Sequence, residues 1–366
     1  MKKKLTVTVF AVFLCVMTYL CIFNPSDAFS VSERRELASF PEISAESIGN
    51  GTFMKDFEIY ASERFPYRDV FRGWKALVNM NVFNKMDNNG IFVADGHISK
   101  IDDSVNETML NHSAEVINGI YDKYLKNQNV NAYFSVIPDK NFILAEENSY
   151  PQIDYNAFAE DMKNRITFAK YIDVANLLQL EDYYTTDTHW KQEKITDVAE
   201  KLGSEMGTDV KSTYKENVLD IPFYGVYTGQ LGIPFKPDTI KYLTNDTLDN
   251  CKVIYYNDMG KPYEDDMYNM EKANGKDPYE MFLSGSAPIV IIENDNAKTD
   301  KELYLFRDSF GSSLAPLMAE GYKKITVIDV RYVQSAYLGA FIKFTENSDA
   351  LFIYSTTLLN SSMAMK

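Results

Sequence analysis

Three residues have the types and spacing that acyl-transfer chemistry needs: Asp187, His189 and Ser309. A serine hydroxyl becomes an effective nucleophile only when a neighbouring base removes its proton. Imidazole suits this task because its pKa lies near neutrality, and a carboxylate fixes its tautomer and stabilises the cation that forms. Asp187 and His189 are two residues apart, so in an extended loop both side chains would project to the same side. We therefore predict a Ser-His-Asp triad.

Both motifs also have a purely structural interpretation. Asp187 is suited to capping a helix expected after it, with His189 and Trp190 packed on the first turn. Asp308 or Ser309 is equally suited to being an ordinary helix cap. The sequence alone leaves these structural roles open beside the catalytic ones.

The elements around these residues predict a parallel sheet. Apolar segments, several of them continuous, alternate with helical segments in the second half of the chain, which is typical of an α/β fold with a mostly parallel sheet buried on both faces. The expected strands include 131–137, 171–174, 289–292, 302–306, 325–330 and 351–354. Ligand sites in such sheets lie at the carboxyl ends of the strands. Residues that we expect near that edge, as substrate or oxyanion contacts, are Gly311, Arg331, Lys140, Trp190 and Thr188.

Helical periodicity and turn signals outline the rest of the chain. Residues 53–60, 70–83, 115–125, 155–166, 191–206 and 312–320 are expected to be helical. Asp95-Gly96 predicts a β-hairpin turn between residues 90–93 and 97–101. Residues 207–286 are rich in glycine, proline and polar residues, and they indicate an inserted subdomain or long loops that cover a site.

The amino terminus predicts export. Lys2, Lys3 and Lys4 precede an uncharged apolar run from Leu5 to Phe23, close to the roughly 20 residues that span a bilayer. We expect an uncleaved anchor with the remainder outside the cytoplasm, and the alternative is a signal cleaved near Ser26-Asp27-Ala28. The predicted organisation is an anchor or signal at 1–28, a tether with helices and the hairpin at 29–100, and a catalytic domain at 101–366 that contains the insertion 207–286.

Composition restricts the partners. The formal net charge is −15 with the three amino-terminal lysines included, and so acidic a surface disfavours nucleic acid and anionic lipid headgroups. Only Cys251 lies outside the apolar run, so no internal disulfide is expected, and we interpret it as a bystander. No second histidine lies near His189 in sequence, so neither a metal site nor another cofactor is expected. His97 and His112 are expected at the surface.

Several motifs carry a family resemblance. Asp187-Thr188-His189-Trp190 together with Asp308-Ser309-Phe310 resembles the DHHW family and, more distantly, the alginate O-acetyltransferase proteins of the SGNH hydrolase superfamily. Further matching segments between residues 30 and 355 are 32–37 with 40–41, Gly51 with Phe53, 65–68, 277–285 and 328–332. One position departs from the family name, because Thr188 stands where its first histidine is expected.

The resemblance implies a fold and a reaction. It implies an SGNH hydrolase-like α/β/α sandwich in which Ser309 is the nucleophile, His189 the base and Asp187 its orienting carboxylate. The implied activity is O-acylation, with acetyl as the expected group, of a cell-surface or secreted polysaccharide outside the cytoplasm. The implied acyl donor partner is a multi-spanning membrane acyltransferase. A carbohydrate esterase of the same fold, and a non-catalytic glycan-binding or scaffold protein, are the alternatives.

Overall fold

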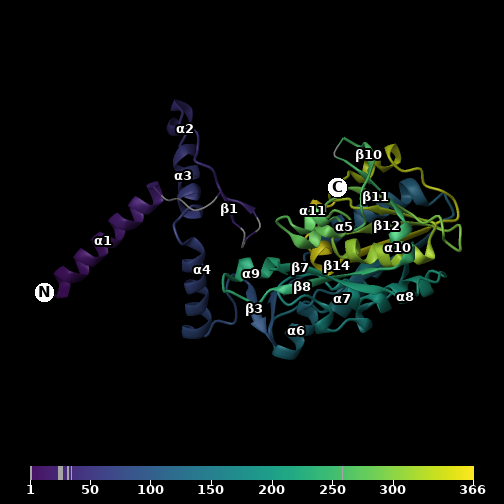
Figure 1. Cartoon of the computed structure of the whole chain (residues 1–366), viewed down its shortest axis with the longest axis horizontal. Helices are drawn as coiled ribbons and strands as arrows, with labels where there is room; N and C mark the ends of the chain where they lie inside the picture. The colour runs from purple at the N-terminus through teal and green to yellow at the C-terminus, as the bar shows by residue number, and fades with distance from the viewer. Residues whose placement is uncertain (1, 24–27, 31–32, 34, 258) are drawn as a thin grey trace. The chain divides into compact units, whose positions relative to one another are not determined.

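The computed structural model describes residues 2–23, 28–30, 33, 35–257 and 259–366 (Figure 1). These residues form two compact units. The first consists of Met1–Phe92 with Val226–Lys236, and the second of Val93–Gly225 with Pro237–Lys366. The three-part division at residues 28 and 100 that we expect from the sequence stays a prediction.

The first unit begins with α1, Lys2–Phe23. Within the described ranges it is the only helix that is long and apolar enough to cross a membrane, and a signal sequence has the same properties. Ser26 and Asp27 of the alternative cleavage site lie outside the described residues.

The rest of the first unit is mostly helical. Its elements are β1 (Phe29–Ser30), β2 (Arg35–Glu36), α2 (Ala45–Gly49), α3 (Thr52–Glu63), α4 (Arg68–Leu77), a π-helical turn (Val78–Val82) and α9 (Val226–Leu231). The two helices expected at 53–60 and 70–83 are therefore confirmed. The expected hairpin is also present, as β3 (Ile91–Ala94) and β4 (His97–Lys100), and its residues from Val93 onward belong to the second unit. Its turn residues Asp95 and Gly96 have φ of 47° and 75°, as an Asp-Gly hairpin turn requires.

An eight-stranded sheet organises the second unit, in the order β10-β9-β11-β13-β12-β14-β5-β6. The strands are β5 (Asn131–Ile137), β6 (Lys170–Tyr171), β9 (Lys252–Tyr256), β10 (Pro262–Glu264), β11 (Ile289–Glu293), β12 (Glu302–Arg307), β13 (Lys324–Ile328) and β14 (Asp349–Ser355). From β13 through to β6 the neighbours run parallel, whereas β11, β9 and β10 add antiparallel strands at the other edge. The mostly parallel sheet expected from the sequence is confirmed.

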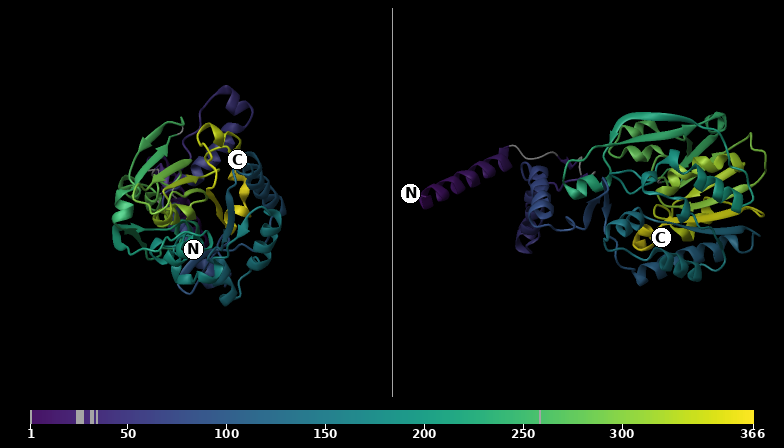
Figure 2. Two further views of the ribbon diagram at one scale, coloured as in Figure 1. Left: turned by 90° about the vertical axis from the view of Figure 1, so that its right-hand side faces the viewer. Right: turned by 90° about the horizontal axis from the view of Figure 1, so that it is seen from below.

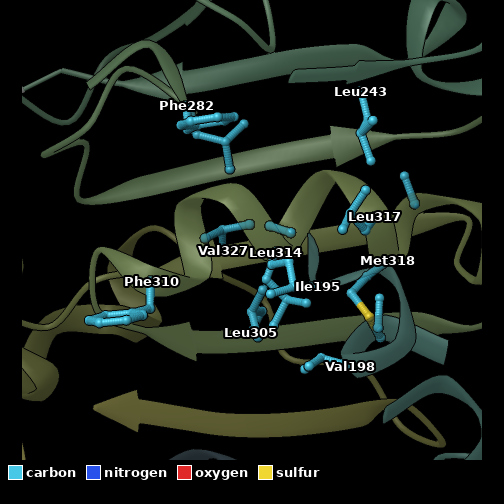
Figure 3. Close-up of a cluster of buried hydrophobic side chains, with 14 of the residues drawn as sticks. Ile195, Val198, Leu243, Phe282, Leu305, Phe310, Leu314, Leu317, Met318 and Val327 are labelled. Atoms are coloured by element: carbon cyan, nitrogen blue, oxygen red, sulfur yellow. The ribbon is translucent and has the colours of Figure 1, made fainter. Parts of the chain in front are cut away.

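Both faces of this sheet are buried. Along β12, Leu303 and Leu305 join one apolar core while Tyr304 and Phe306 join the other, as the two-residue period of a strand dictates. Figure 2 shows the helices on both sides of the strands. Figure 3 shows the first core, in which Leu305 and Val327 of the sheet lie near Leu314. The α/β/α layering follows from this pattern.

The helices of the second unit connect and cover the strands. They are α5 (Glu107–Ile120), α6 (Asn141–Asn148), α7 (Tyr155–Arg165), α8 (Thr196–Glu205), α10 (Asp246–Asn250), α11 (Met270–Ala273), α12 (Phe310–Leu314) and α13 (Thr356–Leu359). Residues of α5 and α7 pack into one core, and residues of α8 and α12 pack into the other.

The helix expected over 191–206 is shorter than predicted. A 3-10 turn (Gln192–Lys194) precedes α8, because Gln192 is buried and committed to tertiary hydrogen bonds. Its side-chain amide donates to the Ser313 carbonyl at 2.8 Å and accepts from the Leu243 N–H at 2.8 Å. These two bonds hold the turn in place of a further helical turn.

Residues 207–286 are more regular than their composition predicts. They contain an antiparallel hairpin, β7 (Lys215–Phe223) with β8 (Asp238–Thr244), and they supply β9 and β10 to the main sheet. The strand signal is weak because several residues of β7 are exposed and polar, so the apolar alternation is incomplete. The segment is therefore built into the domain, and part of it, Val226–Lys236, belongs to the first unit.

Candidate active site

Ser309 stands between the end of β12 and the start of α12, at the carboxyl end of a central parallel strand. The Asp308 carboxylate shapes this turn by accepting a hydrogen bond from the Phe310 N–H at 3.0 Å. Its other oxygen accepts from the N–H and the hydroxyl of Ser355, at 2.8 and 2.7 Å. Because Ser355 ends β14, Asp308 ties two neighbouring strand ends together beneath the serine. The Ser309 hydroxyl makes no capping bond to α12.

The histidine lies on a tight loop that closes on itself. Tyr183 and Trp190 form an isolated antiparallel bridge at its base. The Tyr184 N–H donates to the His189 carbonyl at 3.0 Å, and the His189 N–H donates to the Asp187 carboxylate at 3.2 Å. The loop is thus a narrow hairpin whose tip, not a helix, presents Asp187 and His189.

Residues from three other segments hold this loop. The Asp238 carboxylate accepts from the N–H groups of Thr185 and Thr186, at 2.8 and 2.7 Å, and from the Thr186 hydroxyl at 2.6 Å. The Gly225 N–H donates to the Thr186 hydroxyl at 2.8 Å. A Cβ at Gly225 would lie 2.1 Å from the Thr186 carbonyl oxygen, so only glycine allows this approach. The region 207–286 therefore positions the catalytic candidates.

Lys140 is the third support. It is fully buried, and its ammonium donates to the carbonyls of Tyr184 and Thr185 at 2.8 and 3.1 Å. Burial lowers the pKa of Lys140 to about 8, against the opposing attraction of Asp139 and Asp187. A buried ammonium that holds two loop carbonyls acts as a brace, and this contact replaces the substrate contact that we expected of it.

The three predicted residues meet through side-chain hydrogen bonds. His189 Nδ1 lies 2.6 Å from Asp187 Oδ1, and His189 Nε2 lies 2.7 Å from Ser309 Oγ. A carboxylate can only accept, so Nδ1 carries the proton and Nε2 is free to accept from the serine hydroxyl. This is the arrangement of nucleophile, base and orienting carboxylate that serine acyl transfer uses.

Exposure to solvent falls from Ser309 through His189 to Asp187. Asp187 is 1% exposed and the His189 side chain 12%, whereas Ser309 is half-buried. The serine end is accordingly the end that a substrate can approach. The aspartate is shielded from water, which strengthens its electrostatic effect on the imidazole.

Trp190 links the two halves of the site. Its indole N–H lies 3.0 Å from the Phe310 carbonyl and 2.9 Å from the Ser313 hydroxyl, and the ring is fully buried. The tryptophan beside the histidine is thus anchored to the helix that follows the serine. It has a packing role, and the substrate contact that we expected of it is excluded by its burial.

Tyr279 covers the imidazole. Its ring lies against His189 with centroids 4.0 Å apart and planes inclined by 13°. Its hydroxyl is 3.0 Å from the Ser313 hydroxyl. Our reasoning from the residues did not select Tyr279, although it lies within one of the segments that carry the family resemblance.

Thr188 points away from the serine hydrogen-bond chain, since its hydroxyl donates to Asp139 Oδ2 at 2.9 Å. Asp139 follows β5 and also accepts from the Asn141 N–H at 2.9 Å. The residue that replaces the expected histidine therefore joins the loop tip to the neighbouring strand end. A role for Thr188 in substrate contact stays a prediction.

The other expected oxyanion contacts are engaged elsewhere. Arg331 donates to both oxygens of Asp329, at 2.9 and 2.6 Å, and none of the hydrogen bonds in the described chain joins it to the triad. The N–H groups of Phe310 and Gly311 donate to Asp308. A Cβ at Gly311 would meet Arg307 Cβ at 2.4 Å, so this glycine is required by packing. Within the described residues, the Ser309 N–H is the donor of this turn that makes no hydrogen bond.

The remaining histidines are less exposed than predicted, and the cysteine is partly buried. His97 and His112 are both half-buried, which corrects the surface placement that we expected for them. Burial lowers the pKa of His97 to about 4, and the charges of Lys140 and Lys191 act in the same direction. Burial also raises the pKa of the Cys251 thiol to about 12, which makes it a poor nucleophile. Among the described residues, no three His, Cys, Asp or Glu side chains are grouped as metal ligands.

Comparison with known proteins gives matches to solved structures. No protein-family model matches the chain, and no curated protein matches its sequence. A DHHW family protein from Eubacterium siraeum has a similar structure, with a TM-score of 0.58, 21% identity, and 76% of this chain and 94% of that one covered. PatB1 from Bacillus cereus, solved with a sulfonyl adduct, has a TM-score of 0.56 and 20% identity over 74% of this chain and 95% of that one.

A third and more remote likeness is to the O-acetyltransferase domain of Pseudomonas putida AlgJ, with a TM-score of 0.44 and 11% identity over 74% of this chain and 92% of that one. At about 20% identity, the first two matches are evidence for the fold alone. The chain therefore shares the α/β fold of a DHHW family protein, and the structural likeness expected from its motifs is confirmed at that level.

Proposed function

We propose that this chain is an extracytoplasmic O-acyltransferase that modifies a polysaccharide through Ser309, His189 and Asp187. One observation carries the proposal. A single imidazole bridges a buried carboxylate and a half-buried serine hydroxyl, with 2.6 Å to Asp187 and 2.7 Å to Ser309. A helix cap or a packed histidine needs only one of these contacts, whereas nucleophilic catalysis needs both.

The first half-reaction forms an acyl-enzyme. Ser309 Oγ attacks the donor carbonyl while His189 Nε2 accepts the hydroxyl proton, and the Ser309 N–H stabilises the oxyanion. The leaving group departs with the proton that the imidazolium returns. Asp187 holds Nδ1–H throughout and stabilises the imidazolium.

The second half-reaction transfers the acyl group. A sugar hydroxyl attacks the acyl-serine, gives its proton to His189 Nε2, and leaves as an ester while the proton returns to Ser309 Oγ. Water in place of the sugar would make the protein an esterase with the same residues. We assign a polysaccharide acceptor, and acetyl as the acyl group, because the motifs around Asp187 and Ser309 resemble those of polysaccharide O-acetyltransferases.

The proposed location follows from the amino terminus. A helix of bilayer length begins with lysines ahead of its apolar run, which favours a cytoplasmic amino terminus and an exported domain. We further propose that a multi-spanning membrane acyltransferase supplies the acyl group from the cytoplasmic side. Neither half-reaction, acylation of Ser309 or transfer to the sugar, requires a metal or an organic cofactor bound to this chain.

Turnover of an activated acetyl ester tests the nucleophile. Ser309→Ala should abolish hydrolysis of 4-nitrophenyl acetate, whereas Ser312→Ala, a buried serine three residues further on, should retain it. A sulfonyl fluoride should add one sulfonyl group to the wild-type protein, and peptide mass spectrometry should locate that group on Ser309. Equal turnover in wild type and Ser309→Ala would contradict the triad.

Product analysis separates the two reactions. Purified protein is incubated with the same ester and with oligosaccharides of several surface polysaccharides. Acetylated oligosaccharide that is absent with Ser309→Ala supports a transferase. Release of acetate at the same rate with and without every acceptor supports an esterase instead.

A further inference from the structure

Helix α4 carries an apolar stripe that the protein leaves uncovered. Val70, Trp74 and Leu77 recur at helical spacing and are 52%, 66% and 41% exposed. Tyr67, which precedes the helix, and Val78, which follows it, extend the stripe and are 63% and 41% exposed. A continuous apolar face of this kind is unusual on a surface that meets only water.

The side of α4 next to this stripe is already occupied. Gly73 and Ala76 are buried, and a Cβ at Gly73 would lie 2.8 Å from the Gly232 carbonyl oxygen. Arg72 donates to the Gly229 carbonyl at 2.7 Å, again within the first unit. The helix is thus fixed along its Gly73 side, and the exposed stripe runs beside that packed side.

A cavity adjoins the apolar stripe. It has a volume of about 440 Å³ and lies between α4 and the segment after α9. Its lining includes Val70, Trp74, Leu77, Ile233 and Pro234. The stripe and this cavity together offer an apolar recess beside the indole of Trp74.

The charged residues of α4 suit a lipid headgroup region. Arg68, Arg72 and Lys75 give α4 three cationic side chains against two acids, Asp69 on the helix and Glu33 paired with it, in a chain whose formal net charge is −15. Tryptophan and tyrosine are enriched where a protein meets the headgroups, since their rings have one apolar and one polar end. A helix with aromatic and aliphatic residues on one face and basic residues beside them is typical of an interfacial helix.

Two ion pairs hold α4 close to the point where the chain leaves α1. Glu33 pairs with Arg68 at 2.9 Å and with Arg72 at 3.1 Å. Glu33 is ten residues beyond Phe23, the last residue of α1. At no more than about 3.5 Å per residue, Glu33 lies within roughly 35 Å of the end of the membrane-length helix, and α4 is tied to Glu33. That reach places the stripe within range of the bilayer surface.

We propose that α4 is a second, peripheral membrane contact, and that its stripe from Tyr67 to Val78 lies in the headgroup and upper acyl region of the bilayer. The acidic composition that disfavours anionic lipid overall is weaker at this helix, because its three cations stand against only two acids, Asp69 and Glu33. The contact would hold the first unit against the membrane, independently of any catalytic role of Ser309.

Trp74 is a built-in probe for this contact, since the chain has two tryptophans and Trp190 is fully buried. The full chain is reconstituted into vesicles of phosphatidylcholine with 30% phosphatidylglycerol, prepared with and without bromine on the upper acyl carbons. Brominated lipid should quench the Trp74 share of the emission in wild type. The emission of Trp74→Phe, which comes from Trp190, should be the same in both kinds of vesicle.

A second variant tests the stripe itself. Val70→Asp combined with Leu77→Asp should abolish the bromine quenching of Trp74 and shift its emission to the red. Turnover of a soluble ester and the circular dichroism spectrum should be unchanged, because these residues are exposed and lie in the first unit. If brominated lipid quenches the wild type no more than Trp74→Phe, the bilayer is not the occupant of this face and the proposal fails.

Discussion

The ring of Tyr279 lies flat against the imidazole of His189, with centroids 4.0 Å apart and planes inclined by 13°. Tyr279 is almost fully buried, and its hydroxyl is held by Ser313 at 3.0 Å, so the ring cannot turn freely. The stack fixes the plane of the imidazole while Asp187 and Ser309 fix its in-plane direction. An imidazole held in this way needs no reorganisation when it accepts the serine proton.

The stack predicts a graded response at position 279. Tyr279→Phe keeps the ring and should retain most of kcat, whereas Tyr279→Leu removes it. Loss of an aromatic pair costs about 0.5–1.5 kcal/mol, so Tyr279→Leu should lower kcat roughly 3- to 10-fold. Steady-state kinetics with an activated acetyl ester measures kcat of both variants. Equal losses in the two variants would assign the effect to the hydroxyl instead of the stack.

Asp187→Asn should inactivate the protein without unfolding it. The amide is the same size as the carboxylate, but its N–H₂ can donate to Nδ1 and so favours the tautomer with the proton on Nε2. That tautomer cannot accept the Ser309 proton, and the change costs about ten-thousand-fold in kcat where it has been measured in a serine triad. The melting temperature should stay close to that of the wild type. A variant with nearly full activity would remove Asp187 from the triad.

Gly225→Ala tests whether the region 207–286 positions the histidine loop. The added Cβ would lie 2.1 Å from the Thr186 carbonyl oxygen, and the backbone around Asp187 must move to admit it. We expect loss of activity and of stability together, of the order of 1–3 kcal/mol. Gly119→Ala is the matched control, because nothing lies within 4 Å of its added Cβ and it lies within helix α5. If Gly225→Ala behaves like Gly119→Ala, the loop is not held at this point.

The chemistry of the candidate site could be expected from sequence because it depends on residue type and on strand ends. Ser309 follows an apolar strand and Asp187 lies two residues before His189, and both features are visible in one dimension. The contacts that support the histidine loop over long sequence distances are not visible in the sequence. Asp238 and Gly225 act on the loop through a carboxylate and a missing Cβ, and nothing near them in sequence indicates that they meet Thr186.

The same distinction between local and long-range features explains which elements of the fold were predicted wrongly from the sequence. The central strands such as β12 are apolar on both faces and were predicted within one or two residues. The hairpin β7–β8 has exposed faces, so its pattern resembles that of a loop. Lys140 shows the limit most clearly, because a lysine after a strand is typical of a surface or substrate contact, whereas its ammonium is fully buried.

Burial of Lys140 predicts a pH-dependent stability of definite sign. Its pKa falls from 10.5 to about 8 in the folded chain. Below pH 8 the ammonium is charged in both states, and its contribution to the free energy of unfolding does not vary with pH. Between pH 8 and 10.5 the unfolded chain binds more protons than the folded chain, so the contribution rises with pH. The full rise is about 3 kcal/mol.

Denaturant unfolding of wild type and Lys140→Met from pH 7 to pH 10.5 measures this rise as a difference. Ionisation of the buried tyrosines changes stability above pH 9 in both proteins and therefore cancels. The free energy of unfolding of the wild type should increase relative to that of Lys140→Met across this range. Lys100→Met, a substitution of an exposed lysine on β4, should give a difference that stays flat. A flat or falling difference for Lys140→Met would show that the Lys140 ammonium reaches water in the folded protein.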